Sequence, residues 1–152
     1  MANLTSMRTI KFRGKDATGQ KGWVYGDLVH NMKVTATGLE PRVMVGGYEV
    51  DPETVGHFTG LHDKNGEEIY EGDIIYSEFP DGSKTNGLIE WDEEYSCFGL
   101  MDEYNYRCKL EGYEFPKFDN AIFYNFRKHS KKFEVIGNIY DNPELLSRSK
   151  QA

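Results

Sequence analysis

The chain is 152 residues long, with a formal charge of −7, 14% aromatic residues, and 16 glycines against 5 prolines. This length fits one ordinary domain, or a small domain with an extension. No apolar run approaches the roughly 20 residues that cross a bilayer, which excludes a membrane-spanning helix. The negative charge argues against broad phosphate binding without excluding a local basic patch. Abundant aromatic residues and glycines predict a mainly β protein of short strands joined by tight turns.

The cysteine pattern and the N-terminus bear on the cellular compartment. Cys97 and Cys108 have neither the pattern of a disulfide framework nor zinc-ligand spacing, so we expect two reduced thiols. The first residues lack the charged-then-apolar order of a signal peptide. We therefore expect a cytoplasmic protein, with no membrane partner, no metal and no cofactor.

The N-terminal third contains several strand-like segments. Alternating or β-branched residues predict strands in this part of the chain at 7–13, 23–30, 42–45 and 48–50. The glycine-rich segment 14–22 is expected to be a hairpin loop, and Gly26 to mark a bulge or a close approach of two backbones. Residues 31–40 are expected to form an irregular connection or a short strand around Val34. Asp51 is placed to cap a single helical turn that Pro52 begins.

The middle of the chain predicts an antiparallel meander. Asn65-Gly66 is a strong turn signal, because both residues accept a positive φ. Three strands follow, at 74–78, 87–91 and 95–101, each bounded by turn residues. Strands at this spacing suggest a small barrel or a sandwich.

The C-terminal part is less regular in its pattern. Residues 119–127 fit one face of a short helix, and equally fit the alternation of an aromatic strand; the helix is favoured. A strand is predicted at 133–140. A short helix is predicted to follow at 142–148, with Asn142 as its cap and Pro143 in its first position.

Several stretches share a pattern with a known family. They are V-G-H-F-T-G-L-H-D-K-N-G-E-E-I-Y-E-G-D-I-I at 55–75, G-L-I-E-W at 87–91, F-E-V-I-G-N-I-Y-D-N-P-E-L-L at 133–146, I-K-F-R-G at 10–14 and W-V-Y-G-D-L-V-H at 23–30. Together they resemble the YopX family of phage and prophage proteins from Gram-positive bacteria. The resemblance covers nearly the whole chain except about 102–130, where the lengths and residues depart from the family.

The resemblance implies a β-rich α+β fold with a Src-homology-three-like β-barrel in the C-terminal half, and it implies no established activity. The expected organisation is an N-terminal region of antiparallel strands (1–53), a barrel with a short C-terminal helix (54–146) and a tail (147–152), or one integrated domain. The signature residues have structural explanations as turn glycines, core side chains and turn caps. They are Gly56, Phe58, Gly60, Asn65, Gly66, Tyr70, Gly72, Asp73, Trp91, Gly137 and Asn138.

The candidate chemical groups do not form a catalytic or metal-binding pattern. His57 and His62 lie five residues apart, so they do not share a face of a strand or helix, and no third ligand has characteristic spacing. The carboxylates of Glu71, Asp73 and 92–94 are expected at turns, where contact with water keeps their pKa values close to those of free side chains. We therefore predict no catalytic residue and no enzyme activity, and regard residues 54–76 as an architectural joint.

One basic run is a candidate contact surface. Arg127, Lys128, Lys131 and Lys132 lie beside aromatic residues of 118–126 that include Tyr124, an arrangement that can bind phosphate and stack bases. The simpler interpretation of this run is a solvated turn.

The functional hypothesis is a phage accessory protein that acts as a non-enzymatic interaction module. It would bind a protein partner from phage or host, or associate with itself as a homo-oligomer. The alternative is a nucleic-acid-associated protein that uses the basic and aromatic segment 118–132. An acidic mimic of DNA is a third possibility.

Overall fold

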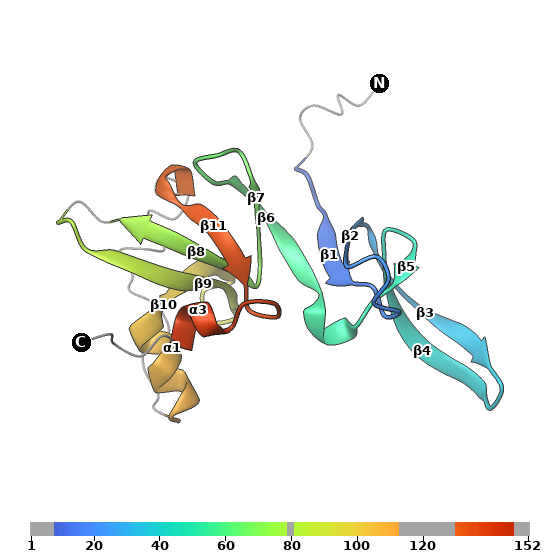
Figure 1. The fold of residues 1–152 in the computed structure, drawn as a ribbon. Coiled ribbons are helices and arrows are strands. Elements are labelled where there is room, and N and C mark those ends of the chain that lie inside the picture. Colours follow the sequence, from blue (N-terminus) through green and yellow to red (C-terminus); the bar gives the residue numbers. More distant parts are fainter. Residues whose placement is uncertain (1–7, 79–80, 113–129, 148–152) are drawn as a thin grey trace, which may run out of the picture. The chain divides into compact units, whose positions relative to one another are not determined.

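The computed structural model describes residues 8–78, 81–112 and 130–147. The fold is mainly antiparallel β with a short C-terminal helix, and the chain divides between Gly60 and Leu61 into two compact units (Figure 1). Among the described residues, no helix has the length and apolar character needed to cross a membrane.

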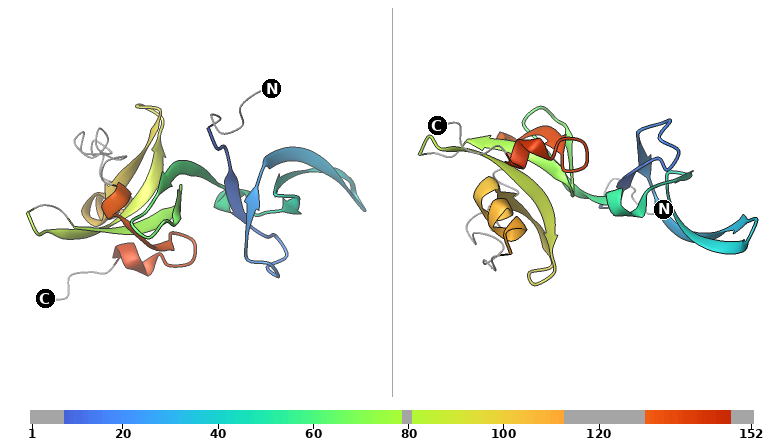
Figure 2. Two further views of the ribbon diagram at one scale, coloured as in Figure 1. Left: turned by 90° about the horizontal axis from the view of Figure 1, so that it is seen from above. Right: turned by 60° about the horizontal axis from the view of Figure 1, so that its bottom comes forward.

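The first unit is built from two antiparallel sheets. Its elements are β1 (Phe12–Lys15), β2 (Trp23–Gly26), β3 (Leu28–Thr35), β4 (Gly38–Val45), β5 (Tyr48–Glu49), the 3-10 helix η2 (Pro52–Thr54) and β6 (Gly56–His62). In one sheet β1 pairs with both β2 and β6, and in the other the order is β3-β4-β5. β3 and β4 pair along their whole length and form a curved two-stranded ribbon (Figure 2).

The core of the first unit is small and formed largely by valines. Val24, Val45 and Val50 are buried together, with Phe12 and Leu28 packed against them. The distal part of the β3–β4 ribbon contributes little to this core, because most of its side chains are exposed or half-buried. The ribbon is a feature of the surface more than of the core.

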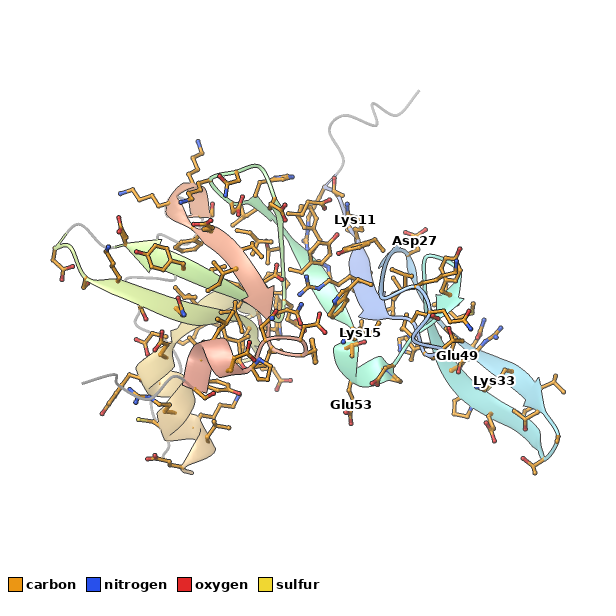
Figure 3. All side chains as sticks on the ribbon, viewed as in Figure 1. Lys11, Lys15, Asp27, Lys33, Glu49 and Glu53 are labelled. Atoms are coloured by element: carbon orange, nitrogen blue, oxygen red, sulfur yellow. The ribbon has the colours of Figure 1, made fainter. Side chains whose placement is uncertain are left out.

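Charged and polar side chains of the ribbon are paired on one face. The Lys33 ammonium lies 2.6 Å from the Glu49 carboxylate, and Arg42 Nε donates a hydrogen bond of 2.7 Å to Asn31 Oδ1 (Figure 3). Strand residues two apart point to the same face, so these interactions leave the opposite face to residues of even number in β3.

The second unit contains a four-stranded sheet of order β10-β9-β8-β11. Its elements are β7 (Glu68–Tyr70), β8 (Asp73–Glu78), β9 (Lys84–Asp92), β10 (Cys97–Asp102), α1 (Glu103–Leu110), the 3-10 helix η3 (Ser130–Lys132), β11 (Glu134–Asn138) and α3 (Glu144–Ser147). β7 follows β6 in their shared sheet.

Both faces of this four-stranded sheet are buried by alternating side chains. Ile75, Ile89 and Leu100 enter one cluster with Ile69 and Phe133. Their neighbours in sequence enter a second cluster under α1 and α3, formed by Ile74, Leu88, Met101 and Leu146. Strand alternation places the two clusters on opposite faces. This is why the strands of the meander are almost continuously apolar.

The predicted meander is confirmed, and several predicted boundaries are wrong. The strand predicted at 7–13 begins at Phe12, because its pairing partners start at Gly26 and His57. The strand predicted at 23–30 divides into β2 and β3 at Asp27. The close backbone approach predicted at Gly26 is present: a Cβ there would lie 2.8 Å from the Gly46 Cα.

Of the two alternatives predicted for 31–40, the strand around Val34 is confirmed and the irregular connection is wrong, because this segment is the end of one regular hairpin. Thr35 pairs with Gly38 at its tip, and the Thr35 hydroxyl donates a hydrogen bond of 2.9 Å to the Gly38 carbonyl. The turn predicted at Asn65-Gly66 is confirmed, and Gly66 has a positive φ of 82° there.

The predictions for the helices had mixed outcomes. Asp51 caps η2 through a hydrogen bond from Glu53 N, with Pro52 in the first position, as predicted. The short C-terminal helix is confirmed as α3, but Asn142 Oδ1 accepts from Asn138 N at the end of β11. The helix α1 at 103–110 was not predicted. The segment 119–127 lies outside the described residues.

Candidate functional site

Three aspartates of the second unit are buried, and two of them, Asp73 and Asp92, were expected at solvated turns. Asp63, Asp73 and Asp92 have between 1% and 5% of their surface exposed, so the expectation of solvated carboxylates is wrong for Asp73 and Asp92. Asp73 Oδ2 accepts a 2.7 Å hydrogen bond from Tyr70 N, and Asp92 Oδ1 accepts from Glu94 N. A short side chain that accepts from the backbone two or three residues away fixes a tight turn.

Asp63 links two distant parts of the second unit. Its Oδ1 accepts from the backbone N–H groups of Asn65 and Glu67, at 2.8 and 2.9 Å. Its Oδ2 accepts from Val135 N in β11, at 3.0 Å, across 72 residues of sequence. Asp63 therefore holds the 64–67 turn and attaches it to β11, which agrees with the prediction that residues 54–76 are an architectural joint.

Most of the signature residues occupy turns or the core. Gly66 and Gly72 lie at turns, with positive φ angles of 82° and 89°. Gly56, Phe58 and Tyr70 are buried, Asn65 lies in the turn that Asp63 holds, Gly137 packs against Asn142, and Asn138 Oδ1 accepts from Tyr140 N. The exceptions are Trp91, which is 46% exposed, and Gly60, which is exposed within β6 and has a φ of 84°.

The candidate histidines lie on β6, and the two candidate basic residues that the structure describes lie in η3. His57 packs edge-on against the Phe12 ring, at 4.8 Å between ring centroids, and His62 is exposed. Lys131 and Lys132 are exposed in η3. Tyr124, Arg127 and Lys128 lie outside the described residues.

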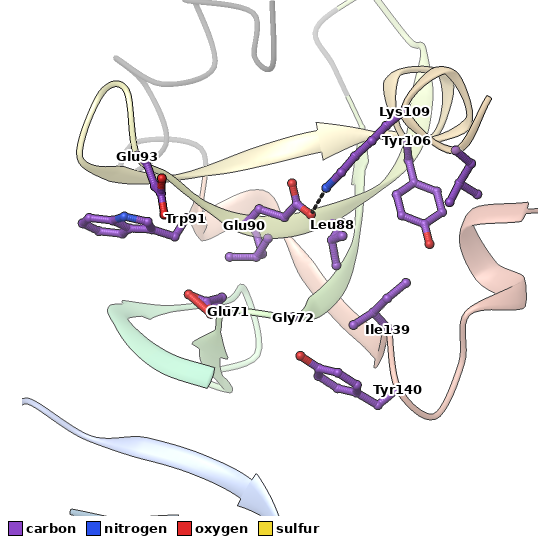
Figure 4. A pocket seen from close by; sticks show the side chains of 12 residues that line it. Glu71, Gly72, Leu88, Glu90, Trp91, Glu93, Tyr106, Lys109, Ile139 and Tyr140 are labelled. Atoms are coloured by element: carbon purple, nitrogen blue, oxygen red, sulfur yellow. Dashed lines mark hydrogen bonds and ion pairs between the residues drawn. The ribbon is translucent and has the colours of Figure 1, made fainter. Parts of the chain in front are cut away.

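A groove in the second unit is the candidate site. Its volume is about 790 Å³. The residues that line it come from β9 and its following turn, from α1, from the β7–β8 turn and from the loop after β11, and they are Glu71, Gly72, Leu88, Ile89, Glu90, Trp91, Glu93, Tyr106, Lys109, Leu110, Ile139 and Tyr140 (Figure 4). Four separate segments therefore meet around one hollow.

The floor of the groove is held by backbone hydrogen bonds at Gly72. Gly72 N donates to the Ile89 carbonyl at 2.8 Å, and the Gly72 carbonyl accepts from Ile139 N at 2.9 Å. The β7–β8 turn is thus fixed to β9 on one side and to the loop after β11 on the other. A groove built on such attachments is preorganised for a ligand.

The charge of the groove is negative. Three glutamates and one lysine line it, and the Lys109 ammonium lies 3.0 Å from the Glu90 carboxylate. Glu71 and Glu93 both lie on the Trp91 side of this ion pair in Figure 4. With three carboxylates against one ammonium, the groove attracts cations.

Aromatic rings lie at both ends of the groove. Trp91 packs edge-on against Phe98, with 4.9 Å between the ring centroids, and stands next to Glu93. Tyr106 and Tyr140 lie at the other end. Exposed tryptophan and tyrosine rings beside carboxylates are suited to hold the alkyl stem and cationic head of a lysine or arginine.

The described lining of the groove provides carboxylates, phenols and one ammonium, with no histidine, cysteine or serine among them. Within the described ranges 8–78, 81–112 and 130–147, no group of three His, Cys, Asp or Glu residues is arranged to hold a metal ion. Charged groups and aromatic rings are what this lining presents to a ligand.

Sequence reasoning identified only part of this groove. Glu71, Gly72, Trp91 and Glu93 were considered for other roles, whereas Tyr106, Lys109 and Tyr140 were missed. A signal was present in the E-W-D-E run at 90–93, which interleaves acidic and aromatic residues. The other half could not be identified without α1, on which Tyr106 and Lys109 lie three residues apart and so share a face.

Cys97 has an altered acidity beside this site. Burial and the nearby Asp92 carboxylate both raise the pKa of the Cys97 thiol, with burial the larger cause. Cys97 and Asp92 are directly paired across β9 and β10. The thiol is therefore held in its protonated, unreactive form.

Comparisons with known proteins identify the family of this chain. The crystal structure of protein EF1440 from Enterococcus faecalis is similar to this chain, with a TM-score of 0.47 and 23% identity, over 92% of this chain and 99% of that one. No curated protein matches the chain. The model of the YopX family, described as YopX protein, matches residues 11–147. This match spans most of the sequence, and the chain belongs to the YopX family.

Proposed function

We propose that the protein is a non-enzymatic interaction module whose groove in the second unit docks a basic segment of a protein partner. The observation that carries the proposal is the combination of three glutamates with exposed aromatic rings around one preorganised hollow. In the phage setting that the family resemblance implies, the partner is a phage or host protein.

Electrostatics supports a basic segment over other ligands. The whole chain has a formal charge of −7, so the field around it and the groove have the same sign. A cationic segment is steered toward such a surface, and complementary charge raises the association rate more than the final affinity. The negative charge of the groove and that of the whole chain would both repel a phosphate backbone.

The aromatic residues of the groove provide a contact that can anchor a side chain of the docked segment. Binding energy at interfaces concentrates in a few aromatic and arginine side chains that fill pockets. Trp91 offers an exposed face next to the Glu93 carboxylate. An arginine placed over this ring would gain a cation–π contact of about 0.5–2 kcal/mol together with an ion pair.

The scaffold is part of the proposal. The Src-homology-three-like barrel implied by the family is proposed for the second unit, whose described strands include the β10-β9-β8-β11 sheet. Small barrels present binding surfaces from their loops and rims, and this groove is formed by a turn and a loop at the sheet. The nucleic-acid alternative stays a prediction.

The test is calorimetry with a panel of synthetic peptides of equal length that are basic, neutral or acidic. The expected result is binding of basic peptides that contain an aromatic residue, and no binding of acidic ones. The variant Glu90→Gln with Glu93→Gln should weaken binding about tenfold, because each lost ion pair is worth up to about 1 kcal/mol.

The matched control removes the same charge elsewhere. Glu67→Gln with Glu144→Gln changes two exposed glutamates that do not line the groove. Peptide affinity should stay within about twofold of the parent, because only the long-range field changes. Equal losses in the two variants would show a non-specific charge effect and refute the groove as the docking site.

A further inference from the structure

The groove of the second unit contains a cation of its own chain, bound to one of its carboxylates. The Lys109 ammonium on α1 lies 3.0 Å from Glu90 Oε1 on β9 and donates a hydrogen bond to it. Figure 4 shows the Lys109 side chain extending from α1 to Glu90. Glu90 therefore already holds the kind of group that a basic partner would bring to the groove.

The place of Lys109 at Glu90 is one that a partner can take. The Lys109 side chain is 55% exposed and the Glu90 side chain 24% exposed, so a ligand reaches both members of the pair. Exposed side chains change rotamer in picoseconds to nanoseconds, and the lysine stem of four carbons is flexible. The ammonium can thus leave Glu90 without a movement of the backbone.

The helix that bears Lys109 is attached to the sheet by other contacts. Tyr106 of α1 packs against the apolar cluster that contains Leu88. At the start of the helix, Glu103 Oε1 accepts a 3.2 Å hydrogen bond from Asn86 N of β9. An exposed ion pair adds little to such an attachment, because water and salt screen it. The Lys109 pair therefore matters more to the groove than to the fold.

The other end of the groove is open to a cation. Glu93 is exposed and stands next to Trp91. In the described part of the chain, Glu93 belongs to no ion pair. A cation can therefore bind at Glu93 and Trp91 without displacing another group, whereas a cation that reaches Glu90 has to displace Lys109.

On the basis of the proposed docking function, we infer that Lys109 is an internal competitor for the partner's cation and sets the affinity of the groove. In the free chain its ammonium neutralises Glu90. When a basic segment docks, a cation of that segment replaces Lys109 at Glu90, and the Lys109 ammonium moves into water. One ion pair is exchanged for another, so the segment gains less at Glu90 than at Glu93.

This exchange favours arginine over lysine in the partner. A lysine that replaces Lys109 forms again the single-ammonium pair that it breaks. A guanidinium can donate two parallel hydrogen bonds to one carboxylate, and it is more weakly hydrated than an ammonium. An arginine therefore replaces Lys109 at Glu90 with a gain, and a lysine replaces it without one.

The test is calorimetry of the full chain at low salt with a basic peptide that contains arginine and an aromatic residue. Lys109→Met removes the ammonium and keeps an unbranched side chain, so it should raise the affinity about fivefold, the value of one competing exposed ion pair. Lys109→Arg keeps the charge but can hold Glu90 with two hydrogen bonds, so it should lower the affinity about threefold. A peptide with lysine in place of arginine should bind the parent about threefold more weakly.

The matched control is Lys84, which forms a similar exposed ion pair outside the groove. Its ammonium lies 3.1 Å from Glu78 Oε1, and neither residue lines the groove. Lys84→Met changes the net charge as Lys109→Met does, and Lys84→Arg preserves it as Lys109→Arg does. Both control variants should change peptide affinity by less than about twofold, because they act only through the long-range field. Urea unfolding establishes that each variant is folded.

Failure of this inference can be told apart from failure of the docking function. If neither the parent nor Lys109→Met binds basic peptides, both are refuted. If the parent binds but Lys109→Met binds no better than Lys84→Met, or Lys109→Arg binds no more weakly than the parent, only the competition by Lys109 is refuted. Equal affinities of the arginine and lysine peptides would refute the exchange at Glu90. A parent that does not bind and a Lys109→Met variant that does would support the competition.

Discussion

Replacing Asp63 tests whether its hydrogen bonds hold the segment 54–76 in place against β11. The Asp63 carboxylate accepts three backbone hydrogen bonds, two within the 64–67 turn and one from Val135 in β11. Asp63→Ala removes all three acceptors at once. Asp63→Asn keeps Oδ1 as an acceptor for the turn but presents an amide N–H to Val135 N, which is also a donor.

The expected losses follow from the exposure of the donors. Asn65 and Glu67 lie at the exposed turn, where water replaces the lost acceptor, so each bond costs about 0.5–1 kcal/mol. Val135 N faces a partly buried site, where an unsatisfied donor costs about 1–3 kcal/mol. Asp63→Ala should therefore destabilise the second unit by about 3 kcal/mol, and Asp63→Asn by about 2 kcal/mol.

The assay uses the single tryptophan of each unit. In a Trp23→Phe background, Trp91 fluorescence reports urea unfolding of the second unit alone. A loss of about 3 kcal/mol moves the urea midpoint down by about 1–2 M. The matched control is His62→Ala at the neighbouring exposed position, which should change stability by less than about 0.5 kcal/mol. An Asp63→Ala variant as stable as this control would refute the reasoning.

Three further predictions concern glycine packing, backbone strain and thiol acidity. Gly87→Ala should cost about 1–3 kcal/mol in urea unfolding, because the added Cβ collides with the Leu100 side chain, whose Cγ lies at 2.9 Å; Leu100→Val should recover part of that loss, and an additive pair would contradict the collision. Gly72→Val should cost at least about 1–3 kcal/mol, since its φ of 89° strains a β-branched residue; an unchanged midpoint would count against this. In a variant lacking the other cysteine, alkylation of Cys97 should have a midpoint above the usual thiol pKa of about 8.5, and Asp92→Asn should lower it. Because folding raises this pKa, the thiol's contribution to stability is complete below the unfolded-state pKa and is lost as the pH rises through the folded-state pKa.

The meander of the second unit was predictable because its local signals agree. Apolar runs such as 74–76 and 87–89 are separated by turn residues, and their side chains fill both faces of the sheet. The turn at Gly66 was also predictable, since Asn-Gly favours a turn. The sequence could not show that Asp63 beside it is buried, because the Val135 N–H that it binds is 72 residues away.

The β3–β4 ribbon and α1 were missed for different reasons. The ribbon turns through T-A-T-G at 35–38, which lacks the usual hairpin residues, and the apolar side chains of its outer part, Met32, Val34 and Leu39, are exposed and cover no core. The segment 103–110 has no apolar periodicity that would predict a helix. Its start was nonetheless signalled, because Asp102 Oδ1 caps it by accepting from Asn105 N. Half of the groove depends on this helix, so the groove could not be assembled from the sequence.

The most direct test of the proposed docking function is an NMR titration of the isotope-labelled chain with a basic, aromatic-containing peptide at low salt. We expect the NMR signals of the Trp91 indole N–H and of the backbone amides of Glu71, Glu93 and Tyr140 to shift together as peptide is added, until they reach saturation. The shifts should diminish as salt is added. Shifts that cluster away from these four residues, or a Trp91 indole signal that does not move at saturating peptide, would contradict the docking function.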